Sequence, residues 1–303
     1  MNGVLVIDKD PGWTSHDVVA KIRNILRIKK VGHTGTLDPF ATGVLPLTLG
    51  RATRLTNYFM SSDKVYRGVM RFGFATTTYD VDGDPVGDRT RPELDASRLE
   101  EIFSRYRGTI EQTLPPYSAK KVQGRPLYSY ARKGIEIAPI KKTIRIHRLT
   151  LHGVEGCEAE FELECSAGTY ARSLAHDIGG EYGCGAHLVR LRRLQSGEFS
   201  IGQAVPLGEE GRIHPADLFL GRVIAVRDLL PHIPPIVVPE GDKRKVLVGM
   251  DLNLLTSETG AEEFRILDES GDLIAIARRI QTFMPPVEQP ARWIRVHPHI
   301  IFN

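Results

Sequence analysis

The feature that most constrains the fold of this chain is one fifteen-residue stretch, Gly32-His33-Thr34-Gly35-Thr36-Leu37-Asp38-Pro39-Phe40-Ala41-Thr42-Gly43-Val44-Leu45-Pro46. Its three glycines and two prolines disfavour regular structure, because glycine permits unusual backbone angles and proline fixes φ and removes a donor. We therefore predict a shaped loop with Asp38 at its centre. An aspartate before a proline commonly begins a turn, so Asp38 alone does not establish chemistry. No Lys-Ser/Thr pair follows the glycines, which argues against a phosphate-binding loop.

Composition places the chain among ordinary globular proteins. It has 303 residues, of which 41% are hydrophobic and 25% are charged. The three cysteines have no spacing typical of a metal site, and we expect buried reduced thiols. The N-terminus has only the four apolar residues Val4 to Ile7, too few for a signal peptide, and no apolar run is long enough to span a membrane. These features predict a cytoplasmic protein.

The hydrophobic pattern predicts strands and helices that alternate without a βαβ rhythm. Strands are expected at residues 4–7, 64–74, 143–151 and 157–166, the last with strict alternation of buried and exposed positions. Helices are expected at 94–106, at 170–182, and after Thr14 or Ser15, either of which can cap a helix. We therefore predict an α+β fold around a mixed and largely antiparallel sheet.

Four prolines in residues 231–239 predict a linker between two domains. The expected domains are residues 1–232, which would hold the chemistry, and residues 237–303. The second contains short apolar runs at 245–248, 264–267, 273–277 and 293–296, separated by turn residues. This pattern is typical of a small all-β barrel.

Residues 119–148 form a strongly basic segment, with nine Lys and Arg residues against one acid. Tyr128 and Tyr130 lie within it, and Tyr117 lies just before it. Basic residues with interleaved aromatics are typical of a surface that follows a phosphate backbone, although a solvated charged face has the same composition. The side chains expected to contact an RNA backbone are Lys120, Lys121, Arg125, Arg132, Lys133, Lys141 and Lys142.

The loop around Asp38 resembles the catalytic loop of the tRNA pseudouridine synthase B family, Gly-His-Thr/Ala-Gly-x-Leu-Asp-Pro-x-Ala-Thr/Ser-Gly-x-Leu-Pro. One family motif departs from the usual pattern, because the proline after Asp8-Lys9 stands one place late, at Pro11. The segment from about residue 237 resembles a PUA domain, a small RNA-binding β-barrel. Other family motifs occur in the expected order over about residues 3–200, at Lys64-Val65-Tyr66, Gly73 to Asp80, Gln112 to Lys121, Gly168 to Leu174 and Leu191-Arg192-Arg193.

This resemblance implies that the chain isomerises uridine to pseudouridine in the T-loop of tRNA, at tRNA position 55, with no cofactor and no metal. It implies that Asp38 is the catalytic carboxylate, Arg172 the cation that keeps it ionised, and Tyr66 a stacking tyrosine. Extrusion of the target base would leave a space that His33 is expected to fill. Whether Asp38 attacks C1′ or supports elimination to a glycal stays open. The remaining implied substrate-binding residues are Lys9, Asp80, Tyr170 and Leu191.

The expected partner is the T-arm of tRNA, with no membrane and no obligate protein partner, and we expect a monomer. A guide-RNA-dependent synthase of the H/ACA type shares the loop and the PUA domain. Such enzymes carry extra sequence before the first strand, whereas three residues precede Val4 here, which favours a stand-alone tRNA enzyme. A non-catalytic RNA-binding protein is the other alternative. The presence of Asp38, Tyr66 and Arg172 together argues against it, because binding a polyanion needs no lone carboxylate.

Overall fold

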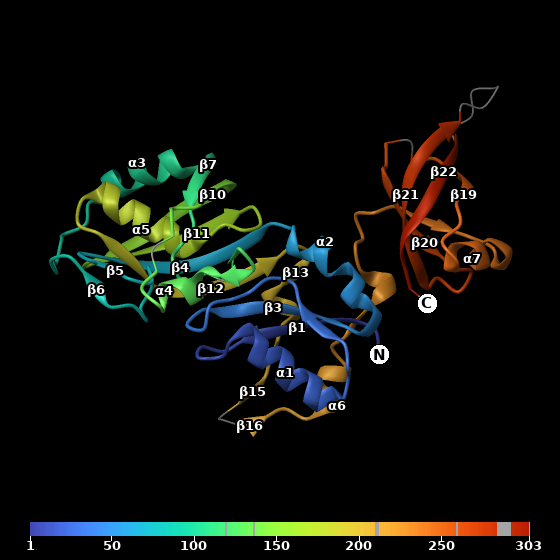
Figure 1. Ribbon diagram of the computed structural model, residues 1–303, viewed down its shortest axis with the longest axis horizontal. Helices are drawn as coiled ribbons and strands as arrows, with labels where there is room; N and C mark the ends of the chain where they lie inside the picture. Colours follow the sequence, from blue (N-terminus) through green and yellow to red (C-terminus); the bar gives the residue numbers. More distant parts are fainter. Residues whose placement is uncertain (119, 136, 210–211, 259, 284–291, 303) are drawn as a thin grey trace.

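The structure is a computed structural model that describes residues 1–118, 120–135, 137–209, 212–258, 260–283 and 292–302. Its backbone forms an eleven-stranded sheet and a separate five-stranded sheet (Figure 1). The path through the large sheet is β14 (Val205–Pro206), β1 (Gly3–Lys9), β3 (Thr42–Leu49), β12 (Ala186–Ser196), β4 (Lys64–Phe72), β11 (Glu158–Cys165), β10 (Lys141–Glu155) and β7 (Gly108–Thr113). Three short strands pair at its margins, namely β2 (Val31–His33) with β3, β13 (Phe199–Ser200) with β12, and β17 (Ile224–Ala225) with β1.

The large sheet is mixed and largely antiparallel, as predicted. Among the described residues its parallel pairings are β1 with β14 and β3 with β12. The other neighbours, including β4 with both β11 and β12, run antiparallel. The predicted α+β class is therefore confirmed.

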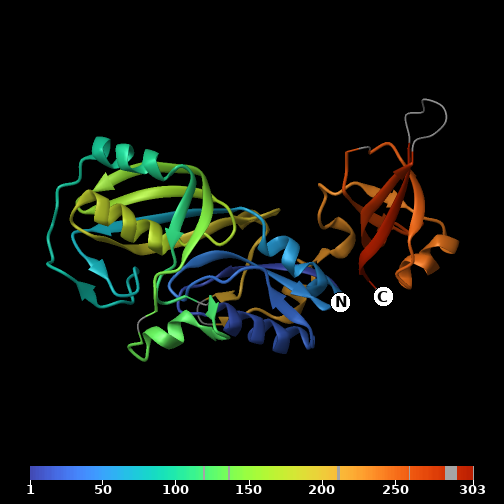
Figure 2. The same cartoon turned by 45° about the horizontal axis from the view of Figure 1, so that its top comes forward.

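Helices pack on one face of this sheet. Helix α1 (Ser15–Leu26) lies against the β1–β3 half, and α3 (Ala96–Tyr106) and α5 (Ala171–Tyr182) lie against the other half (Figure 2). Their buried side chains share one apolar cluster with Leu5, Ile7 and other strand residues. Strand β1 is also buried on its opposite face, where Val4 and Val6 join a second cluster. The strand predicted at residues 4–7 is therefore covered on both sides, which explains its continuous apolar run.

Capping residues determine where the helices begin. The Thr14 hydroxyl accepts a hydrogen bond from Asp17 N (3.1 Å), and the Asp17 carboxylate accepts one from Thr14 N (3.0 Å), which is a capping box. Of the two predicted caps, Thr14 is therefore the one used. Asp95 similarly caps α3 by accepting from the amides of Ser97 and Arg98.

Shorter elements connect these units. They are 3₁₀ helices η1 (Gly50–Leu55), η2 (Ile201–Gln203) and η3 (Val226–Asp228), helices α2 (Thr56–Met60), α4 (Leu127–Ala131) and α6 (Ala216–Leu220), and strand pairs β5 (Ala75–Thr76) with β6 (Pro85–Val86), β8 (Lys121–Val122) with β9 (Arg125–Pro126), and β15 (Gly208–Glu209) with β16 (Arg212–Ile213). The three cysteines are free thiols, but only Cys165 is buried, so the expectation of burial fails for Cys157 and Cys184. Among the described residues no helix is long and apolar enough to cross a bilayer.

The five-stranded sheet forms the C-terminal part of the chain and differs from prediction in two places. Its order is β18 (Pro235–Val237), β20 (Glu263–Leu267), β21 (Leu273–Phe283), β22 (Arg292–Ile301) and β19 (Leu252–Thr256). Strand β18 lies inside the expected proline-rich linker, at the sheet edge, where a missing N–H is tolerated. The run at 245–248, expected as a strand, instead ends helix α7 (Glu240–Leu247). Acids in the first turn of α7 and bases in the last turn favour that helix.

The two sheets meet at an apolar junction. Leu273, Ile276 and Phe302 pack in one cluster with Val4 and Val6 from the back of β1. The Tyr58 hydroxyl of α2 also donates to the Glu263 carboxylate (2.9 Å).

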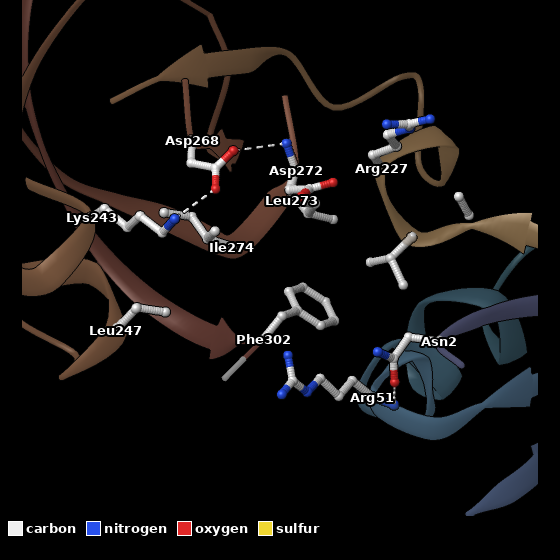
Figure 3. Close-up of a pocket in the computed structure, with 12 residues that line it drawn as sticks. Asn2, Arg51, Arg227, Lys243, Leu247, Asp268, Asp272, Leu273, Ile274 and Phe302 are labelled. Atoms are coloured by element: carbon white, nitrogen blue, oxygen red, sulfur yellow. Dashed lines mark hydrogen bonds and ion pairs between the residues drawn. The ribbon is translucent and has the colours of Figure 1, made fainter. Parts of the chain in front are cut away.

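Beside this junction lies a cavity of about 490 Å³ (Figure 3). Arg51 and Asn2 line it from one side, and the ion pair Lys243–Asp268 (2.8 Å) lines it from the other. The charge of Lys243 is therefore balanced by a carboxylate of the C-terminal sheet.

Candidate active site

The glycine- and proline-rich stretch forms a fixed turn between β2 and β3. Gly12 N donates to the Pro39 carbonyl (2.8 Å), and Ala41 N closes a turn on the Asp38 carbonyl (3.1 Å). The Ser15 hydroxyl, at the start of α1, accepts from Leu37 N (2.9 Å). The shaped loop is present only over residues 34–41, because residues 32–33 belong to β2 and residues 42–46 to β3, where the prediction of irregular structure was wrong. The backbone of the loop is held on both sides of Asp38.

Lys9 is buried against this loop and binds its backbone. It is 0% exposed, and its ammonium donates to the carbonyls of Asp10 (2.9 Å), Trp13 (2.8 Å) and Pro39 (3.1 Å). All three N–H donors of the ammonium are thus used by backbone acceptors. Burial lowers the pKa of Lys9 to about 8. Lys9 therefore holds the backbone of Pro39, the residue after Asp38. Its buried ammonium does not reach the surface, which differs from the substrate-binding role expected for it.

Arg172 brings Asp38 and Asp80 together. It lies in the first turn of α5 and is 5% exposed. Its Nη2 atom donates to Asp38 Oδ1 (2.7 Å) and to the Tyr117 carbonyl (3.0 Å). Its Nη1 atom lies 3.3 Å from Asp80 Oδ2 and donates to the Thr78 carbonyl (3.2 Å). One buried guanidinium therefore bridges two carboxylates that are far apart in the sequence.

The two carboxylates differ in their surroundings. The Asp80 side chain is 6% exposed, and burial raises its pKa, against the opposing effects of a hydrogen bond from Thr78 and the charge of Arg172. The Asp38 side chain keeps 30% of its exposure. Its Oδ2 atom has no hydrogen-bond partner among the described residues. Asp38 is thus the carboxylate with an oxygen available to a ligand.

A cavity of about 400 Å³ opens beside Asp38. Tyr66 from β4, Tyr170 and Arg172 at the start of α5, and Leu191 from β12 line it. Its volume lies within the range of small-molecule sites and suits a single nucleoside. Burial raises the pKa of Tyr66 and of Tyr170, so both phenols stay protonated near neutral pH. Asp38, three apolar or aromatic walls and a guanidinium therefore meet in one space, as the resemblance implies.

Two buried cations, Lys64 and Arg193, also line this cavity. The sequence analysis did not assign either of them to the site. Lys64 donates to the Met60 carbonyl (2.9 Å), and burial lowers its pKa to about 8. Arg193 is 1% exposed and donates to the carbonyls of Val44 (2.7 Å) and Gly35 (3.1 Å), one on each side of Asp38 in sequence. Both belong to motifs of the resemblance, at Lys64-Val65-Tyr66 and Leu191-Arg192-Arg193, and that position was the available signal.

A glycine permits the close approach of Arg193. Gly43 has φ +99°, and a Cβ built there would lie 2.2 Å from the Arg193 carbonyl oxygen. Any larger residue at position 43 would therefore push β3 away from β12.

His33 lies at the end of β2 and does not line the cavity. Its Nδ1 accepts from Gly35 N (3.3 Å), and its ring packs edge-on against His16 with centroids 5.4 Å apart. Burial lowers the pKa of His33 to about 4, with the neighbouring His16 and Arg193 acting in the same direction. The imidazole is therefore neutral near pH 7.

The seven basic side chains expected to contact RNA are all exposed. Lys120 also lines the cavity beside Asp38, so the basic segment begins at the candidate site. Arg132 lies over the Tyr128 ring, 5.4 Å from its centroid. Lys142 donates to the Ala167 carbonyl (3.1 Å), just before the loop that starts α5. Ala119 and Glu136, also in the segment, lie outside the described residues.

Comparison with known proteins gives consistent results. Residues 23–171 match the TruB family pseudouridylate synthase N-terminal domain, and residues 172–209 match the tRNA pseudouridylate synthase B C-terminal domain. The tRNA pseudouridine synthase B of Solibacter usitatus is 44% identical over 91% of this chain and 95% of that protein. The enzyme of the same name from Syntrophus aciditrophicus is 39% identical over 98% of both chains.

Among solved structures, the fold is similar to a chain in an H/ACA ribonucleoprotein bound to a substrate RNA containing 2′-deoxyuridine. The TM-score is 0.71, with 25% identity, over 99% of this chain and 85% of that chain. The likeness therefore covers both sheets.

Proposed function

Since this chain belongs to the TruB family of pseudouridylate synthases, enzymes that isomerise uridine to pseudouridine in tRNA, we propose that its target is the T-loop uridine at tRNA position 55 and that Asp38 is its catalytic carboxylate. The observation that carries the proposal is the free Oδ2 atom of Asp38 at the cavity wall, with Oδ1 bound by a buried arginine.

The reaction breaks the C1′–N1 bond of uridine and forms a C1′–C5 bond. The uracil leaves C1′ with the electron pair of the old bond, turns within the cavity, and uses C5 to bond C1′. The proton on C5 is then lost, and N1 gains a proton, so the product is an isomer of the substrate. Nothing enters or leaves except protons exchanged with groups of the site and water.

Asp38 provides the negative charge that C1′ needs when N1 departs. Its Oδ2 atom can bond C1′ directly or accept a sugar proton in an elimination, and both routes require the ionised form. Arg172 holds the carboxylate in place, because its Nη2 atom donates to Oδ1 at 2.7 Å and leaves Oδ2 without a partner among the described residues. Asp80, on the other side of Arg172, keeps the guanidinium oriented.

The aromatic walls of the cavity would hold the detached uracil. Tyr66 and Tyr170 offer π-faces and protonated hydroxyls, and Leu191 offers an apolar surface. A base that must turn without leaving is held better by stacking than by fixed hydrogen bonds. His33, neutral near pH 7, would fill the space that the uridine leaves when it is extruded and pack against the bases left behind.

The basic segment gives the RNA its second set of contacts. Lys120 lines the cavity beside Asp38, and Lys142 donates to the Ala167 carbonyl (3.1 Å) next to Gly168, which also lines it. Both ammonium groups would therefore contact phosphates close to the extruded nucleotide. We propose that the five-stranded sheet is a PUA-like domain that adds RNA contacts, and that the enzyme acts as a monomer in the cytoplasm without a guide RNA.

Mapping the modified nucleotide tests the target. Wild-type protein is incubated with an unmodified tRNA transcript, with its isolated T-arm stem-loop, and with a transcript whose T-loop uridine 55 is cytidine. Pseudouridine is located by carbodiimide adducts that stop reverse transcription. The proposal predicts one stop that marks position 55, at the nucleotide immediately 3′ of it, in the first two RNAs and none in the third. A stop elsewhere, or modification that requires an added guide RNA, would refute it.

A further inference from the structure

Tyr79 has an unusual backbone conformation beside the candidate site. It lies in the turn between β5 and β6, immediately before Asp80, with φ +66°. A bulky residue rarely adopts this left-handed region, which normally favours glycine or asparagine. The turn holds it there by hydrogen bonds from Tyr79 N to the Thr76 carbonyl (3.2 Å) and from Leu188 N to the Tyr79 carbonyl (3.0 Å). A tyrosine at such a position calls for a role of its side chain.

That side chain stacks on His176 of helix α5. The two rings lie nearly parallel, with centroids 3.8 Å apart and an interplanar angle of 13°. The His176 Nδ1 atom is buried and has no hydrogen-bond partner among the described residues. Burial lowers the pKa of His176, so the imidazole is neutral near pH 7. The contact is therefore a stack of two neutral rings, and the buried Nδ1 atom of the imidazole takes no part in it through hydrogen bonding.

The stack is one of three contacts that the turn at residues 76–83 makes with one face of α5. Arg172 and His176 are separated by four positions, which places them on the same face of the helix. Three consecutive turn residues meet this pair. Thr78 accepts from Arg172 through its carbonyl (3.2 Å), Asp80 pairs with Arg172 through its carboxylate (3.3 Å), and Tyr79 stacks on His176.

These three contacts influence the position of Arg172 relative to Asp38. The same guanidinium holds Asp38 Oδ1 at 2.7 Å. Any rotation or slide of the turn relative to α5 would move the Thr78 and Asp80 acceptors, and Arg172 would follow them away from Asp38. The flat ring contact resists that slide, because it joins the turn to the helix one full turn of α5 beyond Arg172.

We propose that Tyr79 and His176 are positioning residues, whose stacked rings lock the turn at residues 76–83 onto α5 and so aim Arg172 at Asp38. This inference rests on the proposed role of Asp38 and Arg172 and extends it to two side chains that do not line the cavity beside Asp38.

Single-turnover kinetics of the full-length protein on a T-arm stem-loop tests this proposal, with the dissociation constant of the RNA measured in parallel. His176→Ala and Tyr79→Ala should each lower the single-turnover rate about tenfold, the size expected when one stacked aromatic pair is lost, with affinity for the RNA unchanged within about twofold. The double variant should be no slower than either single variant, because the same contact is lost once. His176→Phe and Tyr79→Phe keep the rings and should retain the wild-type rate within about twofold.

Glu181→Gln is the matched control on the same helix, because it loses an exposed ion pair with Arg105 and leaves the stack intact. Thermal unfolding of each variant shows whether the fold is retained. The proposal is overturned if His176→Ala keeps the wild-type rate, or if His176→Phe is as slow as His176→Ala, which would mean that the imidazole itself acts. It is also overturned if the loss is in RNA affinity, because Tyr79 also lines a neighbouring cavity of about 570 Å³ and would then contact RNA. Failure of wild-type protein to modify the stem-loop would refute the proposed function instead.

Discussion

Replacing Arg172 by Met should destabilise the protein as well as inactivate it. The change removes the cation between Asp38 and Asp80 and frees the carbonyls of Thr78 and Tyr117. Removing one partner of a buried ion pair typically costs about 3–5 kcal/mol. Asp38 is partly exposed and can be hydrated, so most of this cost arises at Asp80, which is 6% exposed. We expect the free energy of unfolding at pH 7 to fall by about 3 kcal/mol, at the lower end of that range.

Adding Asp80→Asn isolates the electrostatic part of this loss. Asparagine keeps the shape and the hydrogen bonds of the side chain but carries no charge, so the double variant should recover at least about 1 kcal/mol relative to Arg172→Met alone. Urea unfolding followed by far-UV circular dichroism measures both changes. At about 2 °C per kcal/mol, the lower end of the range for chains of 150–250 residues, the single variant should also melt about 6 °C lower.

The pH dependence gives a second check. Burial already raises the pKa of Asp80 in the wild type, and loss of Arg172 removes an opposing effect, so the pKa rises further. A carboxyl whose folded-state pKa is raised binds more protons in the folded state than in the unfolded state, so its contribution to stability falls as pH rises through that pKa. The deficit of Arg172→Met should therefore be largest at neutral pH and should shrink as pH falls toward 4. A double variant no more stable than the single one, or a deficit independent of pH, would refute a buried Asp80 charge as its cause.

Three further predictions concern the loop and the RNA surface. Lys9→Met should lower the turnover rate with little change in RNA affinity, because the ammonium binds the Pro39 carbonyl and does not line the cavity. A loss of RNA affinity in filter binding with an unchanged turnover rate would contradict this. Burial lowers the pKa of His33 from 6.5 to about 4, so the free energy of unfolding should fall as pH drops from about 6.5 to 4. His33→Gln should make that fall smaller in urea titrations. An unchanged pH profile would show that His33 is not the group responsible. The triple variant Arg132→Ala/Lys133→Ala/Lys141→Ala should weaken RNA binding and reduce the slope of log K against log salt by about 2–3, at about 0.7–0.9 per lost phosphate contact. An unchanged salt slope would place the RNA elsewhere.

The main architecture was predictable because it follows from short-range patterns. Alternation at residues 157–166 became β11, and Thr14, one of the two expected caps, began its helix. The dense glycines and prolines around Asp38 marked a fixed loop, since few other conformations suit them. The C-terminal part was less predictable, because residues 245–248 have an apolar pattern too short to separate a strand from a helix end.

The site depended on contacts between distant segments, which no local pattern reveals. The bridge from Asp38 through Arg172 to Asp80 joins residues 38, 80 and 172, and the resemblance indicated the residues but not the geometry. Lys9 was expected at the substrate and lies buried beneath the loop. Arg193 was not assigned, because an arginine in a strand is ordinarily exposed and only the tertiary fold buries it. The role of the Tyr79 turn likewise emerges only from its position against α5.

Tritium release from a T-arm stem-loop labelled at uridine C5 tests the central role of Asp38 most directly. Wild-type protein and Asp38→Asn are compared, since asparagine preserves the size of the side chain and removes its charge. Formation of the C1′–C5 bond must expel the hydrogen on C5. We predict stoichiometric release, one tritium per RNA, by wild type and none by Asp38→Asn, with both proteins binding the RNA with similar affinity. Release by Asp38→Asn at the wild-type rate would show that another group performs the chemistry.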